Sequence, residues 1–248
     1  MSVKKILVSQ PKPTSEKSPY FDLASKYGVE VVFRPFIRIE GLTSREFRQS
    51  KISISDYTAV IFLSRTAIDH YFRLAEELRF AVPESMKYFC ISETTAHYLQ
   101  KYIVYRKRKI FYSETGKIDE LLPIIEKHKK EKFIYPMSDV HDSSNSRLQA
   151  LPIDYTPAVM YRTVSNDFKE GETLPQDYDM IIFFTPSGVK TLKADFPQFV
   201  QGDIAIGGMG GKTIREIEEQ GLRLDVTVTP ETRSMAAAIA KYLDEHQG

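Results

Sequence analysis

Two stretches of the sequence carry hydroxyl side chains at the same spacing behind an apolar run. Residues 60–68 read VIFLSRTAI and residues 181–189 read IIFFTPSGV. The hydroxyl residues, two positions apart in each stretch, are Ser64, Thr66, Thr185 and Ser187. A hydroxyl at the end of a strand can cap the next helix and leave its first N–H groups facing a crevice, where they attract carboxylate or phosphate. Each stretch therefore predicts a turn suited to binding an anion.

The next strand-to-helix junctions of the two halves also correspond. Residues 91–95 read ISETT and residues 209–213 read MGGKT, and both end in threonine, at Thr95 and Thr213. Four such turns facing one another would form a clamp for a polyanion. Serine and threonine are common helix caps in any α/β protein, so for a single turn simple capping is the better interpretation. The duplicated arrangement favours the binding interpretation.

These turns need a regular framework, and the rest of the sequence predicts one. Short apolar runs alternate with amphipathic stretches, which is typical of βαβ units and parallel sheets. The expected strands are residues 5–9, 29–33, 60–63, 86–91, 133–135, 179–184, 203–206 and 224–228. The expected helices are residues 16–27, 67–78, 95–101, 118–127, 188–194, 213–220 and 233–244. Two longer extended stretches, residues 35–39 and 155–164, complete the pattern.

Length and charge narrow the class of protein. The chain has 248 residues, which suits two domains of ordinary size. Its 34 basic and 33 acidic residues give a formal net charge of +1, which argues against a general nucleic-acid or membrane-surface binder. No apolar run reaches the length of a signal peptide or a transmembrane helix, so we expect a cytoplasmic location and no membrane partner.

Motifs for other chemistries are incomplete. Residues 211–213 read GKT, like the end of a P-loop, but the earlier glycine that this motif needs is replaced by Ile206. Gly208 and Gly210 lack the third glycine of a dinucleotide-binding fingerprint. Cys90 is the only cysteine and the five histidines show no close pairing, so we expect no metal site.

Several motifs resemble those of the uroporphyrinogen-III synthase family. Residues 183–189 are similar to the family's turn from a phenylalanine-ended strand through threonine or serine into a helix, and residues 209–213 resemble its I-G-x-x-T junction. Residues 159–163 resemble its V-Y-x-T strand. In the N-terminal part, residues 30–39 look like the family's strand with an embedded proline, and residues 62–68 repeat the C-terminal turn. Their order and spacing extend the resemblance over nearly the whole chain.

The resemblance implies an α/β fold of two flavodoxin-like parallel-sheet domains joined by a two-stranded β-ladder. In such a fold the chain starts one domain, crosses to build the other, and then returns. Mapped onto this sequence, domain one is residues 1–35 with 166–248, and domain two is residues 40–157. Residues 36–39 and 158–165 would be the connecting strands, which fits the two long extended stretches.

The resemblance also implies a reaction. The family closes linear hydroxymethylbilane into uroporphyrinogen III, losing water and inverting the last pyrrole ring, as a cofactor-independent cyclising lyase of tetrapyrrole and heme biosynthesis. The substrate carries eight carboxylates, which suits a cleft of helix N-termini with Arg65 and Lys212 adding charge. The expected substrate-binding residues are Ser64, Arg65, Thr66, Thr95, Thr185, Ser187, Gly188, Lys212 and Thr213.

Tyr161 matches the family's tyrosine and is the expected catalytic residue, as a donor of a proton or a hydrogen bond to the departing hydroxyl. Packing on the connecting strand is an equally good interpretation of this side chain. The substrate is already activated and closes unaided to the wrong isomer, so the enzyme's work can be mostly positioning. The expected partners are the linear tetrapyrrole and, transiently, hydroxymethylbilane synthase, and nothing demands more than a monomer.

Two junctions depart from the family pattern. Ser9 and Gln10 stand where the family has Thr-Arg, so a guanidinium contact is missing. Ser92 and Glu93 replace Gly-x, and a glutamate there competes with an anionic ligand for the helix terminus next to Thr95. The alternative to the enzyme is therefore a non-catalytic two-domain ligand-binding or regulatory protein with the same fold.

Overall fold

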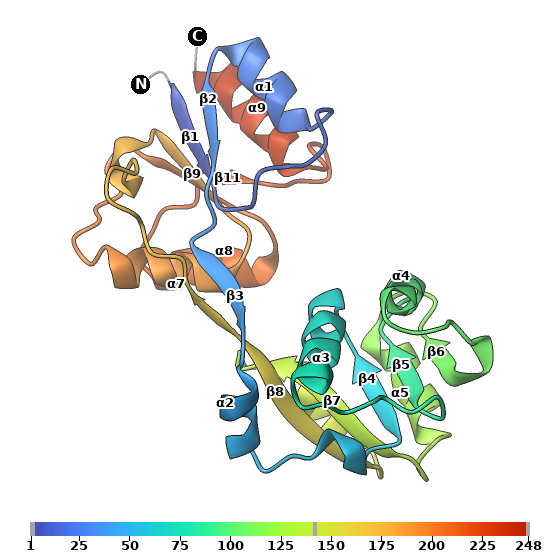
Figure 1. Ribbon diagram of the computed structural model, residues 1–248. Helices are drawn as coiled ribbons and strands as arrows, with labels where there is room; N and C mark the ends of the chain where they lie inside the picture. Colours follow the sequence, from blue (N-terminus) through green and yellow to red (C-terminus); the bar gives the residue numbers. More distant parts are fainter. Residues whose placement is uncertain (1–2, 141–142, 247–248) are drawn as a thin grey trace. The chain divides into compact units, whose positions relative to one another are not determined.

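The computed structural model of the protein describes residues 3–140 and 143–246 (Figure 1). The contacts divide the chain into two compact units, one made of Met1–Arg38 with Val164–Gly248 and the other of Ile39–Thr163. The first unit is therefore discontinuous in sequence, and the second is inserted into it. Each unit has a sheet of its own.

The sheet of the discontinuous unit consists of parallel strands in the order β11-β10-β9-β1-β2. They are β1 (Lys5–Val8), β2 (Glu30–Phe33), β9 (Met180–Phe183), β10 (Ala205–Gly208) and β11 (Val226–Thr227). This is the strand order of flavodoxin, in which the chain winds first one way and then the other from the middle of the sheet. The direction of winding changes between β1 and β9.

Helices cover both faces of this sheet because its strands are apolar on both sides. Along β9, Met180 and Ile182 pack with residues of α1 and α9, whereas Ile181 and Phe183 pack with residues of α7 and α8. Figure 1 shows α1 beside α9 on one face and α7 beside α8 on the other. The bounds are α1 (Pro19–Tyr27), η4 (Pro175–Asp177), α7 (Pro186–Asp195), α8 (Gly211–Glu219) and α9 (Met235–His246).

The sheet of the inserted unit has its strands in the order β3-β8-β7-β4-β5-β6. They are β3 (Ile37–Gly41), β4 (Ala59–Phe62), β5 (Lys87–Cys90), β6 (Ile110–Tyr112), β7 (Lys132–Ser138) and β8 (Asp154–Ser165). The strands from β8 to β6 are parallel. The edge strand β3 runs antiparallel to β8, because Leu42 donates to the carbonyl of Met160 after one end of β3 and Asn166 donates to Phe36 before the other.

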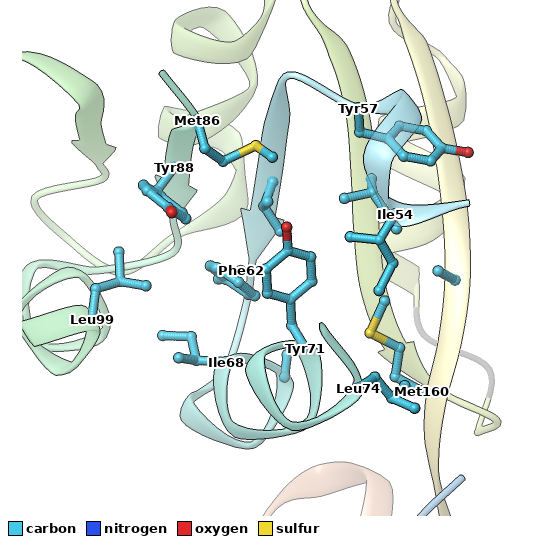
Figure 2. Close-up of a cluster of buried hydrophobic side chains, with 14 of the residues drawn as sticks. Ile54, Tyr57, Phe62, Ile68, Tyr71, Leu74, Met86, Tyr88, Leu99 and Met160 are labelled. Carbon is cyan, nitrogen blue, oxygen red and sulfur yellow. The ribbon is translucent and has the colours of Figure 1, made fainter. Parts of the chain in front are cut away.

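Two apolar cores lie on the two faces of this second sheet. One packs against α3 and α4 and the other against α5 and α6. Figure 2 shows the first core, where the rings of Phe62 on β4 and Tyr71 on α3 meet edge to face with their centroids 5.5 Å apart. The bounds are α2 (Ser44–Gln49), η1 (Ile54–Asp56), α3 (Arg65–Glu77), α4 (Glu93–Tyr98), η2 (Leu99–Lys101), η3 (Lys107–Lys109), α5 (Ile118–Glu126) and α6 (Ser143–Gln149).

The two sheets have the same order of strands, but the chain begins at a different strand in each. When β7, β8, β4, β5 and β6 take the places of β1, β2, β9, β10 and β11, the strand order is the same. In this correspondence β4 with α3 matches β9 with α7, and β5 with α4 matches β10 with α8. These are the pairs that the repeated sequence motifs indicated, so the internal duplication is confirmed in the fold.

The chain passes between the units at positions 38–39 and 163–164, which lie within β3 and β8. On the inserted side of these crossings, Arg162 of β8 binds two carboxylates. Its guanidinium lies 2.6 Å from Glu40 of β3 and 3.0 Å from Glu46 of α2. The helix α2 was not among those expected from the sequence, although a threonine three positions before a glutamate is the signature of a capping box.

Glu46 gives the fold a measurable dependence on pH. The Thr43 N–H and hydroxyl donate to its carboxylate, and with Arg162 they lower its pKa from 4.5 to about 2. A carboxyl whose folded pKa lies below its unfolded value stabilises the fold above the unfolded pKa, and this contribution is lost as the pH falls through the folded pKa. We therefore expect Glu46→Gln to be less stable than the wild type near neutral pH and to approach it at about pH 2. Urea unfolding at both pH values measures the difference, and an equal gap at both would contradict the assignment.

Candidate active site at the strand-to-helix turns

In an open α/β sheet, ligands bind beyond the carboxyl ends of the strands, where the direction of winding changes. In the inserted unit this place lies between β4 and β7. A pocket of about 130 Å³ is found there. Its lining includes Ser64 and Ala67 from the turn between β4 and α3, residues 135–138 at the end of β7, and Tyr161 of β8. Two residues expected from the sequence, Ser64 and Tyr161, therefore meet at one pocket.

A β-bulge turns the Tyr161 side chain toward this pocket. Met137 of β7 pairs with Val159, and the next residue of β7 pairs with Tyr161, so Met160 is an extra residue on β8. Side chains alternate between the faces of a strand, and an extra residue reverses the alternation beyond it. Met160 and Tyr161 both belong to the core beneath α3, whereas Val159 is exposed. In a regular strand Tyr161 would point to the opposite face of the sheet.

The surroundings of Tyr161 fit both interpretations drawn from the sequence. Only 9 % of this side chain is exposed, and its ring stacks on the imidazole of His70 with the ring centroids 5.0 Å apart. Its hydroxyl lies 3.5 Å from the Ser64 Oγ at the pocket. The ring is thus packed, and the hydroxyl is placed where a ligand in the pocket can receive a hydrogen bond.

Ser64 forms the N-cap of α3. Its Oγ accepts a hydrogen bond from the Ala67 N–H at 3.0 Å. Arg65 and Thr66 lie before Ala67 in the first helical turn, where backbone N–H groups have no partner within the helix. The exposed Arg65 holds its guanidinium 5.3 Å from the centre of the Tyr98 ring. This end of α3 therefore offers backbone donors and a positive charge.

An acidic residue ties α3 to the following helical segment. The carboxylate of Asp69 accepts hydrogen bonds from the hydroxyls of Tyr98 and Tyr102 and from the ammonium of Lys101. These hydrogen bonds lower its pKa, although burial opposes them. These contacts hold the first part of α3 against the end of α4 and against η2.

The turn before α4 is more closed than its counterparts. Ser92 Oγ accepts from the Thr95 N–H at 3.3 Å and shares hydrogen bonds of 3.0 Å with the hydroxyls of Thr94 and Thr95. Thr95 is buried, and Glu93 accepts a hydrogen bond of 3.3 Å from the Tyr112 hydroxyl. The Thr95 side chain is therefore engaged inside the cap, and a substrate contact at this turn stays a prediction.

In the discontinuous unit, Thr185 caps α7 by accepting a hydrogen bond of 3.2 Å from the Gly188 N–H. Pro186 follows as the first helical residue, and Ser187 is partly exposed in the first turn. The equivalence with Ser64 extends to the backbone, since Ile91 donates to Phe62 in one sheet at 2.9 Å and Met209 donates to Phe183 in the other at 3.0 Å.

The turn between β10 and α8 depends on glycine. Gly210 has a φ of 86°, which side chains other than hydrogen rarely allow, and it places the start of α8 directly after the strand. A Cβ on Gly208 would lie 2.6 Å from the Ile217 side chain, so this glycine lets α8 approach the sheet. Lys212 is exposed in the first turn, and Thr213 is buried with its N–H bonded to the Gly210 carbonyl at 3.0 Å.

The expected site residues therefore form a group in each unit. Adjacent strands β4 and β5 place one group at the same edge of their sheet, where Ser64 meets Tyr161, and adjacent strands β9 and β10 place the other. The first group is Ser64, Arg65, Thr66 and Thr95. The second group is Thr185, Ser187, Gly188, Lys212 and Thr213. Each unit thus presents two neighbouring helix starts at the carboxyl edge of its sheet.

The cap at Thr185 can be tested by its contribution to stability. We expect Thr185→Ala to lower the free energy of unfolding by about 1 kcal/mol, because the Gly188 N–H loses its acceptor. Thr185→Ser keeps the oxygen and should retain most of the stability. Urea unfolding of the two variants makes the comparison, and equal losses would show that the hydroxyl does not act as the cap.

Other kinds of site find no support in residues 3–140 and 143–246. No group of three or more histidine, cysteine, aspartate or glutamate side chains in these ranges is arranged to hold a metal ion. None of the helices described is long and apolar enough to cross a membrane. Cys90 is fully buried, and burial raises the pKa of its thiol.

Comparisons with known proteins agree with the motifs. The family model described as uroporphyrinogen-III synthase HemD matches residues 18–243. Uroporphyrinogen-III synthetase from Helicobacter pylori is 18 % identical, with a TM-score of 0.61 over 98 % of this chain and 100 % of that one. A mutant uroporphyrinogen III synthase from Thermus thermophilus is 13 % identical, with a TM-score of 0.57 over 98 % and 99 % of the two chains. No match is found among curated proteins.

At these identities the two structures establish a shared fold, and the α/β architecture with two parallel-dominated sheets is confirmed. The family match spans most of the chain and includes both pairs of duplicated turns. The chain belongs to the uroporphyrinogen-III synthase family.

Proposed function

We propose that this chain cyclises hydroxymethylbilane to uroporphyrinogen III, with inversion of the last pyrrole ring and loss of one water. The observation that carries the proposal is the family match over residues 18–243. A non-catalytic ligand-binding protein of the same fold is not favoured by this match. The enzyme is accordingly a cyclising lyase of tetrapyrrole biosynthesis.

The turns described above would bind the carboxylates of the substrate. Helix starts carry partial positive charge and unpaired N–H groups, and such groups match a ligand with many carboxylates. Arg65 and Lys212 lie exposed at two of these starts and add full charges. Several weak contacts of this kind would hold the flexible chain of pyrrole rings in a bent conformation, which brings its ends together.

Tyr161 would act on the leaving group. In the reaction the hydroxyl of the substrate departs as water, so it must gain a proton while its bond to carbon breaks. The Tyr161 hydroxyl, beside Ser64 at the pocket, is placed to donate a hydrogen bond or a proton to that oxygen. The last ring then attacks through its substituted carbon, and its rearrangement gives the inverted ring.

The test supplies hydroxymethylbilane, generated in place by its own synthase, and separates the isomers that form. We expect the type III isomer to dominate when this protein is present. The substrate closes unaided to the type I isomer, so type I alone at the spontaneous rate would remove the enzyme proposal. A reaction with heat-denatured protein is the control.

Further parts of the proposal concern context. A transient contact with hydroxymethylbilane synthase is supported by the substrate's own reactivity, because direct transfer would shorten the time available for spontaneous closure. The paired strands β3 and β8 are the proposed link between residues 1–35 with 166–248 and residues 40–157. A monomeric state and a cytoplasmic location also stay predictions, and size-exclusion chromatography with light scattering tests the first.

A further inference from the structure

A histidine packs behind the tyrosine at the pocket. The imidazole of His70 and the ring of Tyr161 are stacked, with centroids 5.0 Å apart and planes 18° from parallel. Tyr161 and Ser64 line the pocket, and His70 is not part of that lining. His70 is partly buried on α3, between the pocket residue and the edge strand β3. It therefore contacts the expected catalytic side chain without lining the pocket.

Arg73 fixes the orientation of this imidazole. The Arg73 Nε–H donates to His70 Nδ1 at 3.3 Å. Arginine is always protonated in proteins, so Nδ1 must be the acceptor and the proton of the neutral ring sits on Nε2. Arg73 itself is held at two further points, by Glu77 one turn along α3 and by the carbonyl of Leu42 at 2.7 Å. The imidazole thus has one tautomer and little freedom to rotate.

Burial and a neighbouring positive charge favour the neutral form of the His70 ring. Burial lowers its pKa, and the positive charge of Arg73 lowers it further, while Asp69 acts in the opposite direction. Gly41 of β3, which lies next to the ring, brings no charge. A neutral ring stacks on the tyrosine and still accepts from Arg73, which a protonated ring does not.

The backbone of β3 lies close to both the His70 ring and the Arg73 guanidinium. A Cβ on Gly41 would lie 2.6 Å from Arg73 Nη2 and 2.7 Å from His70 Nδ1. Gly41 is not among the glycines with positive φ, so the obstacle to alanine is the closeness of these neighbours and not the backbone conformation. A side chain at position 41 would therefore displace the His70 ring or the Arg73 guanidinium.

We propose that His70 is a positioning residue for the cyclisation: held by Arg73 and by the close approach of Gly41, its ring fixes the Tyr161 ring so that the hydroxyl stays beside Ser64 at the pocket. The proposal rests on the proposed function for its kinetic consequence. The bulge at Met160 determines which face of the sheet the Tyr161 side chain lies on, and stacking on His70 determines the orientation of its ring.

Kinetics separate this role from packing alone. We expect His70→Ala to lower kcat roughly 10-fold with little change in KM, because a slightly misplaced donor slows the chemical step. His70→Phe keeps a stacked ring and should recover most of the loss. The double variant His70→Ala/Tyr161→Phe should be no slower than Tyr161→Phe alone, and losses that multiply would overturn the proposal. His97, which stacks on Tyr105 away from the pocket, is the matched control, and His97→Ala should keep the wild-type kcat.

A spectroscopic test does not depend on activity. Imidazole nitrogen shifts, assigned by their loss in His70→Ala, should show a proton on Nε2 in the wild type and a mixture of tautomers in Arg73→Met. The Tyr161 ring resonances, assigned with Tyr161→Phe, should shift in His70→Ala and in Gly41→Ala, which moves the imidazole without touching the pocket. Unchanged Tyr161 resonances in both variants would overturn the proposal. If the wild type forms no type III isomer, the proposed function fails, and these resonances still decide whether His70 positions Tyr161.

Discussion

Tyr161→Phe should lower kcat for type III formation about 100-fold, because it removes the hydroxyl that is placed to protonate the departing group. The ring remains, so its stacking on His70 and its place in the core beneath α3 should be kept. KM should change little, since the carboxylates are bound elsewhere. Initial rates with freshly generated hydroxymethylbilane, corrected for the type I isomer that forms unaided, give the measurement.

The same strand offers a matched control. Tyr155 is a partly buried tyrosine of β8, six positions before Tyr161 and nearer the amino end of the strand. Tyr155→Phe removes the same atom and should leave kcat within about twofold of the wild type. If Tyr161→Phe were as active as this control, the hydroxyl would have no part in the chemistry. The enzyme would then act by positioning alone.

Lys212→Glu should raise KM roughly 30- to 100-fold, which is the effect of losing an attraction of about 1 kcal/mol or more and adding a repulsion of similar size. Lys212 is exposed in the first turn of α8, where the helix start already favours an anion. Lys212→Met removes only the attraction and should have roughly half the effect in free energy. Because exposed charges are screened over about 8 Å at physiological ionic strength, the effect of both changes should shrink as salt is added.

Lys129→Glu is the matched control, because it makes the same change of charge at the amino end of the strands, in the sheet of the inserted unit. Lys129 is exposed between α5 and β7, before the amino end of the strand. Ligands of α/β sheets bind beyond the carboxyl ends, so this variant should keep the wild-type KM. A similar rise in KM for both variants would mean that only the overall charge matters. An unchanged KM in Lys212→Glu would remove Lys212 from the site.

The helix starts were predictable from the sequence because capping is a local interaction. Ser64 and Thr185 each bond the N–H three positions later, so the residues that form the cap are close together in the chain. The sequence also showed that the two halves correspond. The order of strands in the sheets could not be predicted from the sequence. The inserted unit has the same order as the other unit, but its chain begins at a different strand.

The environment of Tyr161 could not be predicted from local patterns. Its direction depends on one extra residue opposite β7, and the register between two strands is set by the packing of the whole sheet. The role of His70 could not be predicted, because a histidine on a helix is usually at the surface or at the edge of the core. Only the fold brings its ring to Tyr161 of β8. Thr95 corresponds to Thr213 in the sequence, and both are buried, but only the fold shows that the Thr95 hydroxyl is bonded to Ser92.

The insertion of one unit into the other has a consequence for the order of events during synthesis. Lys5 and Asp179 are hydrogen-bonded although they are 174 positions apart, and β1 pairs with β9 in the finished sheet. The inserted unit is complete once Thr163 has left the ribosome, whereas β1, which pairs with β2, gains its second neighbour only when β9 has emerged. Domains fold as units while the chain is being made, and distant pairings form slowly. We therefore expect the unit that holds Tyr161 to be folded first, while the sheet of the other unit remains incomplete until the last third of the chain emerges.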